Sequence, residues 1–557
     1  MISSQEIRTV VNSLPFVQIS NEIIEDATGK VEFDIYIKAT ENVPYIQWHV
    51  IISPLYPFKL SGHASIEFIN LNLIQYPHIM EHGNLCLHTP DYFDVSQQLT
   101  NDLYQLKDWI IEYYIEEKTD SHYEHLVVNS VHDQIFLFTD FDKSPLKGDY
   151  GLARLSSPML GQREDNDKIH ETNVYTRIIK AISSSKNWPK EWNFCKLSSV
   201  YRSPSSSDEM GLYCILDNIP CRHNKFIVKD FKEIGDFLSQ EQRKFIIESS
   251  KKSFKDSNIP ILIGYNINAE EIHWQVFLYD PNINLSMGKK FAKAGFPTVW
   301  ISEFLSSPIA WAQTENMKYS YFFGRGALPI SIAKMKILMI GIGAIGSMVA
   351  TTLVRMGAMK ITLSDYDKVV PGNICRSEYK FFGGFGDKTS SLSKNLISIS
   401  PFVDVDQLPA DLLNGAISLA ATKSQESNSL KKILDRYDLI IDCTTDNYLM
   451  YGLEQLKLSA TIINLSISNK ASELVCAFSP NICKVIDLVY TRILNSDPTD
   501  LYYPTGCWNY TFKASYNDIA TKVQYALSNI IKMLSKQIPM SNFYISEIDN
   551  CLEFKPI

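Results

Sequence analysis

A glycine loop between an apolar strand and a helix is the feature that most constrains the fold of this chain. Gly341, Gly343 and Gly346 stand in GIGAIG, which follows the apolar run KILMI and precedes SMVATTLVRMG, a helix expected to end at Gly357. Glycines permit a tight turn and a close backbone approach to phosphate, and the helix N-terminus offers free N–H groups and a positive dipole end. The pattern predicts a nucleotide-binding unit, which NAD, FAD and ATP enzymes all share.

Strand and helix patterns alternate from about residue 321 onward. KITLSDYD, DLIIDC and TIINLS predict further strands, each separated from the next by helical sequence. Such alternation indicates a parallel sheet with helical crossovers. Residues 321–557 are therefore predicted to form an α/β domain.

The two earlier regions differ from this pattern. Residues 1–130 combine the strand-like runs FDIYIKA and IQWHVIISP with the helical NDLYQLKDWIIEYYIEE, which predicts an α+β domain. Residues 131–320 contain Ser-rich loops and strand-like runs such as FIVKDF, IPILIGY and WQVFLYD, and we expect a mixed linker or scaffold domain. The chain is thus predicted to be an α/β and α+β multidomain protein.

Composition excludes several classes of protein. The formal charge of −9 argues against nucleic acid or an anionic membrane as the main partner, and no apolar run reaches the roughly 18–20 residues of a membrane span. The start, MISSQEIRTVVNSLPF, lacks a basic stretch before an apolar core, so we expect no signal peptide. The 10 cysteines include no C-x-x-C pair, which argues against a zinc ribbon and fits a reducing cytoplasm.

Charged and amide side chains follow the predicted strands of the third region. Asp365 ends the strand after the glycine loop, where an acid can bind ribose hydroxyls. The further candidates for nucleotide binding are Asp367, Asn373, Arg376, Lys388 and Asp446. Carboxylates, an amide and cations at several strand ends suit a triphosphate with a divalent ion better than a nicotinamide.

This set resembles the ThiF and MoeB family of adenylating enzymes, to which ubiquitin-activating enzymes belong. The family combines the glycine loop with Asp-x-Asp, Asn-x-x-Arg, a lysine about a dozen residues before Asn-Pro, and a Thr-Asp-Asn ending. Here Ser400-Pro401 replaces Asn-Pro, CTTDN has one extra threonine, and GDK replaces Gly-x-x-Lys. The resemblance implies a Rossmann-like adenylation domain.

The same resemblance implies roles for individual residues and two cofactors, ATP and Mg²⁺. Asp365 would hold the ribose, and Asp446 would help to hold the metal ion. Asn373, Arg376 and Lys388 would contact the phosphates.

Cys86 stands in a second signature, YPFKLSG followed by YPHIMEHGNLCLH, whose first tyrosines, Tyr56 and Tyr76, are twenty positions apart. This order resembles the ubiquitin-conjugating fold, which has a Tyr-Pro-Phe turn, a His-Pro-Asn triplet and a catalytic cysteine eight positions after the asparagine. Eight positions before Cys86 stands His78, so the triplet here is Tyr-Pro-His. The resemblance implies that Cys86 is a nucleophile and that His78 either supports the oxyanion through an N–H donor or only packs.

Cys507 stands in PTGCWNYTF, where Pro and Gly favour an exposed loop. In ubiquitin-activating relatives, a cysteine on a mobile segment after the core attacks the acyl-adenylate. The resemblance makes Cys507 the candidate, on a cysteine segment at about 485–520. Cys476 and Cys483 lie in strand-like apolar runs and are predicted to be core.

The whole chain resembles bacterial fusions of a ubiquitin-conjugating-like and an activating-like domain, as found in CBASS antiphage operons. That resemblance implies that ATP activates a partner's C-terminal carboxylate, Cys507 takes the acyl group as a thioester, and Cys86 passes it to an amine of a target. The implied modifier is a cGAS-like nucleotidyltransferase, with a bacterial ubiquitin-like protein as the alternative. The activating domains are expected to pair as a homodimer.

Three other hypotheses stay open at this point. An NAD- or FAD-dependent oxidoreductase shares GIGAIG, but it does not account for Asn373, Arg376, Lys388 or the surroundings of Cys86. A non-catalytic scaffold would explain the missing asparagine in the Tyr-Pro-His triplet. Activation of a sulfur carrier would leave the domain that contains Cys86 without a role.

Overall fold

The computed structural model describes two compact units. They comprise Met1–Phe194 with Ser206–Glu315, and Cys195–Ser205 with Asn316–Ile557. None of the helices in the described ranges combines the length and apolarity that a membrane crossing requires. The domain boundaries at 130 and 320 stay predictions. The structure describes residues 2–557 except 60–63, 81, 88, 119–129, 166–167, 186–188, 219–227, 229, 254–257, 269–270, 280–287, 296, 298, 303–307, 414–424, 469–470, 494–513 and 550.

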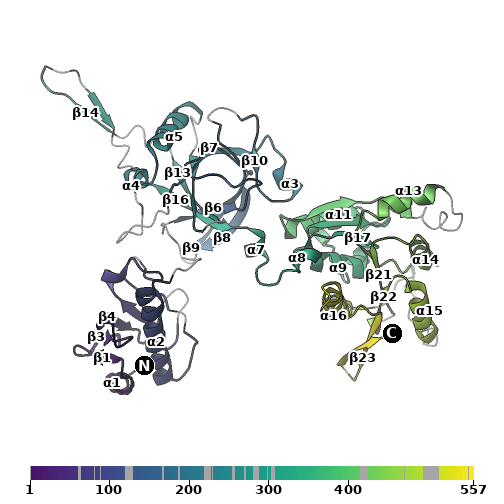
Figure 1. The fold of residues 1–557 in the computed structure, drawn as a ribbon, viewed down its shortest axis with the longest axis horizontal. Helices are drawn as coiled ribbons and strands as arrows, with labels where there is room; N and C mark the ends of the chain where they lie inside the picture. Colours follow the sequence, from purple (N-terminus) through teal and green to yellow (C-terminus); the bar gives the residue numbers. More distant parts are fainter. Residues whose placement is uncertain are drawn as a thin grey trace. The chain divides into compact units, whose positions relative to one another are not determined.

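The N-terminal part of the first unit is an antiparallel sheet with helices. The strands pair in the order β1-β3-β4-β5, and β2 pairs with β3. Side chains of β3 alternate between buried and partly exposed, as FDIYIKA predicts, and the buried ones share a core with side chains of α2. The ribbon in Figure 1 shows α2 alongside the strands of this sheet. The helix that NDLYQLKDWIIEYYIEE predicts begins six residues earlier, at Val95, and its last part, η2, is π-helical. The elements are α1 (Ser4–Ser13), β1 (Val17–Ile19), β2 (Ile24–Glu25), β3 (Val31–Ile37), β4 (Ile46–Ile52), β5 (Ile66–Ile69), η1 (Leu71–Leu73), α2 (Val95–Trp109) and η2 (Ile110–Ile115).

The rest of the first unit is built on a sheet that closes on itself. The strand order is β10-β9-β6-β16-β13-β12-β11-β7, and β7 also pairs with β9. The predicted strand FIVKDF (226–231) lies partly outside the described residues. Its last residue, Phe231, begins helix α4 instead, because Asp230 accepts a hydrogen bond from Glu233 N (2.8 Å) and caps that helix. The elements are β6 (Ser130–Phe138), β7 (Tyr150–Leu155), β8 (Met159–Asp165), β9 (Lys168–Ser183), β10 (Asn193–Phe194), β11 (Glu209–Ile215), α4 (Phe231–Gly235), α5 (Gln240–Ser253), β12 (Ile259–Asn266), β13 (Ile272–Tyr279), β14 (Gly288–Phe291), β15 (Val299–Ser302) and β16 (Ala310–Asn316).

The second unit contains the predicted parallel sheet. The strand order is β19-β18-β17-β20-β21-β22-β23-β24, parallel from β19 to β21 and antiparallel beyond it. The elements are α3 (Ser199–Arg202), α7 (Tyr319–Phe322), α8 (Ile330–Ala333), β17 (Lys336–Ile340), α9 (Ala344–Arg355), β18 (Lys360–Ser364), α10 (Pro371–Ile374), η4 (Phe381–Gly383), α11 (Lys388–Ile399), β19 (Asp404–Gln407), α13 (Gln425–Leu434), β20 (Leu439–Asp442), α14 (Asn447–Gln455), β21 (Thr461–Ile467), β22 (Glu473–Phe478), α15 (Ile482–Ile493), α16 (Tyr516–Leu534), β23 (Phe543–Ile548) and β24 (Cys551–Pro556).

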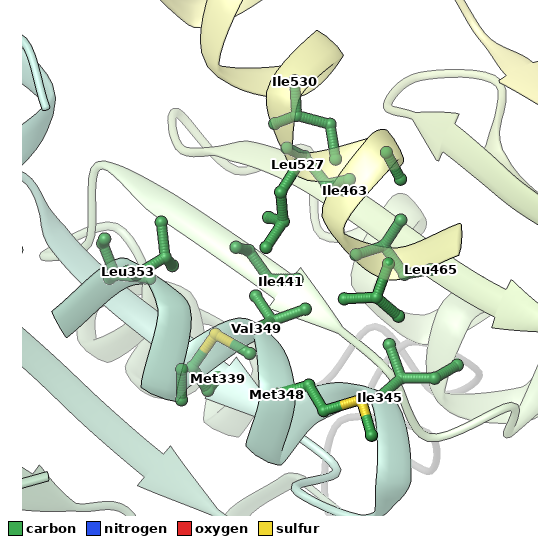
Figure 2. Close-up of a cluster of buried hydrophobic side chains, with 14 of the residues drawn as sticks. Met339, Ile345, Met348, Val349, Leu353, Ile441, Ile463, Leu465, Leu527 and Ile530 are labelled. Atoms are coloured by element: carbon green, nitrogen blue, oxygen red, sulfur yellow. The ribbon is translucent and has the colours of Figure 1, made fainter. Parts of the chain in front are cut away.

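Helices α9 and α16 pack on this sheet through one continuous apolar core. Figure 2 shows Ile441 of β20 between Val349 of α9 and Leu527 of α16, with Ile463 of β21 beside Leu527. Burial of apolar surface at roughly 25 cal/mol per Å² is the main stabilising contribution of such a core. The consequence is a rigid support for the loop between β17 and α9.

The second unit also includes a segment from the middle of the chain. Ser198 N donates to the carbonyl oxygen of Pro401 (2.8 Å), and both Ser199 N and Ser199 Oγ donate to Asp404 Oδ1 (2.9 Å each). These bonds attach Cys195–Ser205 beside β19.

Candidate active site

A cavity of about 170 Å³ lies at the carboxyl ends of β17, β18 and β20. The chain leaves β17 toward β18 on one side and reaches β20 on the other, so the strand order reverses there. Open α/β sheets bind ligands at such a point. The sequence-predicted residues that line the cavity are Gly341, Gly343, Asp365, Asp367, Lys388 and Asp446.

The three glycines of the loop have different environments. Gly341 has φ +73°, and a Cβ there would lie 2.8 Å from Thr444 N. A Cβ on Gly346 would lie 2.0 Å from the carbonyl oxygen of Gly341, whereas one on Gly343 would meet nothing within 4 Å. Gly341 and Gly346 therefore serve the tight turn, and Gly343 leaves open space at the N-terminus of α9, where an anion is favoured.

This difference predicts opposite results for two matched substitutions. Gly341→Ala should lower the unfolding free energy by at least about 2 kcal/mol, because the new methyl group meets backbone and φ is positive. Gly343→Ala should leave stability nearly unchanged but weaken ATP binding if a phosphate lies at this helix N-terminus, because its methyl group would fill the open space there. Thermal unfolding and ATP titration of both variants test this, and equal stability of the two would contradict it.

A lysine and two carboxylates stand together at the end of β18. Asp365 Oδ2 accepts from Ile342 N (2.9 Å) and Oδ1 from Asp367 N (2.8 Å), which ties β18 to the glycine loop. Lys388 Nζ donates to Asp367 Oδ2 (2.8 Å) and lies 3.9 Å from Asp365 Oδ1. Burial raises the pKa of Asp365, and Lys388 partly opposes that rise. The cluster presents one buried cation and acceptor oxygens to the cavity.

Asp442, which the sequence reasoning missed, anchors the loop after β20. Its buried carboxylate accepts from Thr444 N (3.0 Å), Thr444 Oγ1 (2.7 Å) and Asn464 Nδ2 (3.0 Å). Ser466 Oγ in turn donates to Asn464 Oδ1 (2.6 Å). The signal was present as an acid and an amide at the ends of the apolar runs DLIID and IIN.

The extra threonine of CTTDN is accommodated by one unusual backbone conformation. Thr445 has φ +59°, the left-handed region that β-branched residues rarely adopt. The turn leaves Asp446 as the N-cap of α14, where Oδ1 accepts from Tyr448 N (2.9 Å) and Leu449 N (3.1 Å). Both capping hydrogen bonds go to Oδ1, so the second oxygen of Asp446, Oδ2, takes no part in capping the helix.

The carboxylates of the cavity suit a metal ion that is bound together with a nucleotide, rather than one held by protein side chains alone. Within the described residues, no three His, Cys, Asp or Glu side chains are grouped so that they could hold a metal ion. Mg²⁺ bound with ATP usually takes one or two carboxylates together with phosphate oxygens and water. Asp446, which lines the cavity, is a suitable carboxylate of this kind.

Asn373 and Arg376 lie on the segment after β18 but are not among the residues that line the cavity in the described structure. Asn373 Oδ1 accepts from Val370 N (2.9 Å) and closes the first turn of α10. Arg376 N donates to the carbonyl oxygen of Asn373 (3.2 Å). Their contacts with phosphate stay predictions.

Cys86 is exposed, and its backbone is hydrogen-bonded to the backbone of His78. Cys86 N donates to the carbonyl oxygen of His78 (2.8 Å), and Leu85 N donates to that of Phe68 (2.8 Å). His78 has φ +66°, and its ring contacts Tyr113 edge-on with centroids 4.9 Å apart. The structure therefore brings the two predicted residues together, and the oxyanion role of the His78 side chain stays a prediction.

A buried aspartate holds the loop that follows Cys86. Asp102 on α2 accepts from Thr89 Oγ1 (2.6 Å), Tyr56 OH (2.8 Å) and Gln98 Nε2 (3.1 Å). Burial first, and Asp102 second, raise the pKa of Tyr56 far above its ordinary value, so its hydroxyl stays a donor. Asp102 thus joins the segments before and after Cys86 to one helix.

Removing Asp102 should loosen this site. Asp102→Ala takes the acceptor from the buried Tyr56 hydroxyl and the part-buried Thr89 hydroxyl, and one of two acceptors from the Gln98 amide, so we expect a loss of about 2–4 kcal/mol in unfolding free energy. Asp91→Ala is the matched control, because it breaks only an exposed pair with Lys59 (2.9 Å) and should change stability little. Urea unfolding of both variants measures the difference, and similar losses would contradict the role of Asp102.

The remaining predicted cysteines divide into two groups. Cys507 lies outside the described residues, so its role stays a prediction. Burial raises the pKa of Cys476 well above its ordinary value, as expected of a core thiol. Cys483 lies on helix α15 rather than in a strand, and burial followed by Glu454 raises its pKa to about 12. Neither thiol would be an effective nucleophile near neutral pH.

Comparison with known proteins finds sequence relatives of the second unit. Residues 322–452 match the ThiF family. The chain is 24% identical over 257 residues to the ATP-dependent ubiquitin transferase-like protein Cap2 of Enterobacter hormaechei, over 45% of this chain and 41% of that protein. It is 33% identical over 116 residues to the ubiquitin-like modifier-activating enzyme atg7 of Neurospora crassa, over 20% of this chain and 17% of that protein. The chain thus spans about two fifths of the first relative's length and about one sixth of the second's.

Among solved structures, the chain is similar to E. coli MccB with ATP. The identity is 17%, the TM-score is 0.29, and the likeness covers 41% of this chain and 64% of that one. The family match, together with the reversal of strand order at the glycine loop, supports a ThiF-type adenylation domain with a Rossmann-like sheet in the second unit.

Proposed function

We propose that this chain activates a partner protein's C-terminal carboxylate with ATP and conjugates it to an amine through two cysteines. The main support for the proposal is the cavity in residues 322–452, at the point where the strand order of the sheet reverses. There, Gly343 leaves space at a helix N-terminus, and Lys388 stands beside Asp365. A buried cation beside a phosphate site favours adenylation over hydride transfer.

In the proposed first step, a carboxylate oxygen of the partner attacks the α-phosphorus of ATP and the bond to pyrophosphate breaks. Lys388, the N-terminus of α9 and Arg376 would stabilise the charge that develops on the phosphate oxygens. Asp365 would bind the ribose, and Asp446 would bind the Mg²⁺ that accompanies ATP.

In the proposed later steps, the acyl group moves between sulfur atoms. The thiolate of Cys507 attacks the acyl carbon and AMP leaves; the thiolate of Cys86 then displaces Cys507. An amine of the target attacks the Cys86 thioester, and the thiolate leaves as the amide forms. The exposure of Cys86 and its backbone contact with His78 support its place as the last carrier.

The proposed partner is a protein modifier with a free C-terminus. The names of the relatives, a ubiquitin transferase-like protein and a ubiquitin-like modifier-activating enzyme, support this class. We favour a cGAS-like nucleotidyltransferase of a CBASS antiphage system as the modifier, with a ubiquitin-like protein as the alternative. A cytoplasmic homodimer is part of the same proposal.

Isotope exchange and thioester trapping test the proposal. Purified chain with ATP, Mg²⁺ and a candidate modifier should exchange pyrophosphate into ATP and form a hydroxylamine-labile adduct. A modifier whose C-terminal carboxylate is converted to an amide should support neither reaction, because the attacking carboxylate oxygen is then absent. If neither a nucleotidyltransferase nor a ubiquitin-like modifier encoded nearby supports exchange, the proposed function is wrong.

A further inference from the structure

A second cavity, of about 420 Å³, lies where β7, β9 and β11 meet at one end of the closed sheet in the first unit. The loop after β6 and the segments that lead into β7 and β10 complete its wall. Small-molecule pockets commonly have about this volume, and the mouths of closed sheets are among their usual positions. The cavity contains none of the residues assigned to ATP or to acyl transfer, so the proposed function leaves it without a role.

Hydrogen bonds hold the wall of this cavity in place. Asn193 Oδ1 accepts from Lys143 N (3.0 Å), and Asn193 Nδ2 donates to the carbonyl oxygen of Lys143 (2.6 Å), which joins the loop after β6 to β10. Ser183 Oγ at the end of β9 donates to the carbonyl oxygen of Glu191 (3.0 Å). The cavity is therefore built into the fold rather than left between loose loops.

The hydroxyl of Tyr213 on β11 has no hydrogen bond to any residue that the structure describes. Tyr213 is 2% exposed and lines the cavity. The described polar atoms that are both sealed from solvent and unbonded do not include this hydroxyl, so it is reached from the cavity. Burial first, and the charge of Asp149 second, raise the pKa of Tyr213, so the hydroxyl stays protonated. A buried side chain that keeps its polar atom open toward a cavity points to a ligand.

Carboxylates are the other prominent groups of the lining. Asp142, Asp149 and Glu191 line the cavity, and Lys143 is the one cation among the described lining residues. Asp149 Oδ2 accepts from Leu146 N (2.9 Å), whereas its Oδ1 accepts no hydrogen bond within the described part of the chain. No three of the described acids are grouped closely enough to hold a metal ion. Separated carboxylates in a cavity of this size suit an organic cation instead.

We propose that this cavity binds a primary alkylammonium group, which donates hydrogen bonds to the Asp149 carboxylate and to the Tyr213 hydroxyl. An ammonium group has three donors and no acceptor, so one charged and one neutral acceptor suit it. Trp192, on whose ring Arg154 stacks at 4.8 Å from the centroid, adds apolar surface for the attached carbon chain. A free polyamine and the side chain of a lysine share this chemistry. The inference does not depend on the proposed conjugation.

Titration of the full chain with amines, followed by ligand-observed NMR, tests this site. Butylamine should bind at least about tenfold more tightly than butyltrimethylammonium, which has the same charge but no N–H group. Asp149→Asn should weaken butylamine about tenfold or more, and Tyr213→Phe about threefold. Both variants should unfold at the wild-type temperature, because the asparagine carbonyl can still accept from Leu146 N and phenylalanine keeps the ring of Tyr213.

Glu248→Gln is the matched control, because it removes one acidic charge from the exposed face of α5, outside the cavity lining. It should keep the wild-type affinity for butylamine. Tighter binding of spermidine than of Nα-acetyl-lysine methylamide would identify a polyamine as the ligand, and the reverse would identify a lysine side chain. The proposal is overturned if the wild type binds neither, if it binds butylamine and butyltrimethylammonium equally, or if Asp149→Asn and Glu248→Gln have the same effect.

Discussion

Lys388→Ala is expected to reduce pyrophosphate exchange by roughly a hundred- to a thousandfold, the loss typical of removing one preorganised stabilising donor. Lys388 is 6% exposed at the start of α11, and its ammonium group lies between two carboxylates. Without it, Asp365 and Asp367 would repel both each other and the incoming triphosphate. Exchange of labelled pyrophosphate into ATP measures the loss.

Lys394→Ala is the matched control, since Lys394 lies on the same helix with its side chain exposed. It should exchange pyrophosphate at the wild-type rate. Normal exchange by the Lys388 variant would show that the cation serves stability alone.

The Lys388 variant should also have a pH-dependent stability. Burial already raises the pKa of Asp365, and removal of Lys388 takes away the main opposing influence, so that pKa rises further. An acid with a raised folded-state pKa stabilises the fold below its unfolded pKa, and this contribution is lost as pH rises through the folded pKa. The variant's stability deficit should therefore shrink from neutral pH toward about pH 4, near the ordinary range of an aspartate. Urea unfolding at several pH values measures this.

Cys86→Ala should stop conjugation while leaving the first thioester in place. Loss of a nucleophile commonly costs three or more orders of magnitude in rate, so product should fall at least about a thousandfold. Cys507→Ala should abolish every thioester, because nothing else would capture the acyl-adenylate. Gels with and without reducing agent, run with the genuine modifier, separate the two adducts.

Cys551→Ala is the control for this pair, because Cys551 is also exposed but belongs to the terminal strand β24. It should leave both adducts and product unchanged. Equal loss of the first adduct in the Cys86 and Cys507 variants would contradict the order of transfer.

The parallel part of the second unit could be predicted from sequence because its elements have strong local signals. KILMI is followed by glycine, KITLS is followed by an acid and LIID ends in one, and β17, β18 and β20 occupy these three runs. The apolar run around Cys476 indicated β22, whereas β23 and β24 were not predicted. The antiparallel pairing of these three strands could not be predicted, because an apolar run does not encode the direction of a strand. The closed sheet around β9 was missed for a related reason, since its pairings join residues far apart in the chain.

The residues of the site that stand in the loops and helix starts after the strands could be predicted from the sequence. The polar residues that are themselves the last residue of a strand were not predicted. Asp365, Lys388 and Asp446 line the cavity as the motif positions indicate. Ser364, which also lines the cavity, and Asp442 were overlooked because each stands as the last residue of an apolar run, where hydropathy predicts only burial.

The position of Asp446 at the start of α14 has a practical consequence for anyone who dissects this enzyme genetically. One of its oxygens secures the helix, so alanine there would fray the first turn and remove the charge at the same time. Asparagine caps helices about as well as aspartate. Asp446→Asn is therefore the substitution that isolates electrostatics from architecture, and an alanine scan would misattribute one effect to the other.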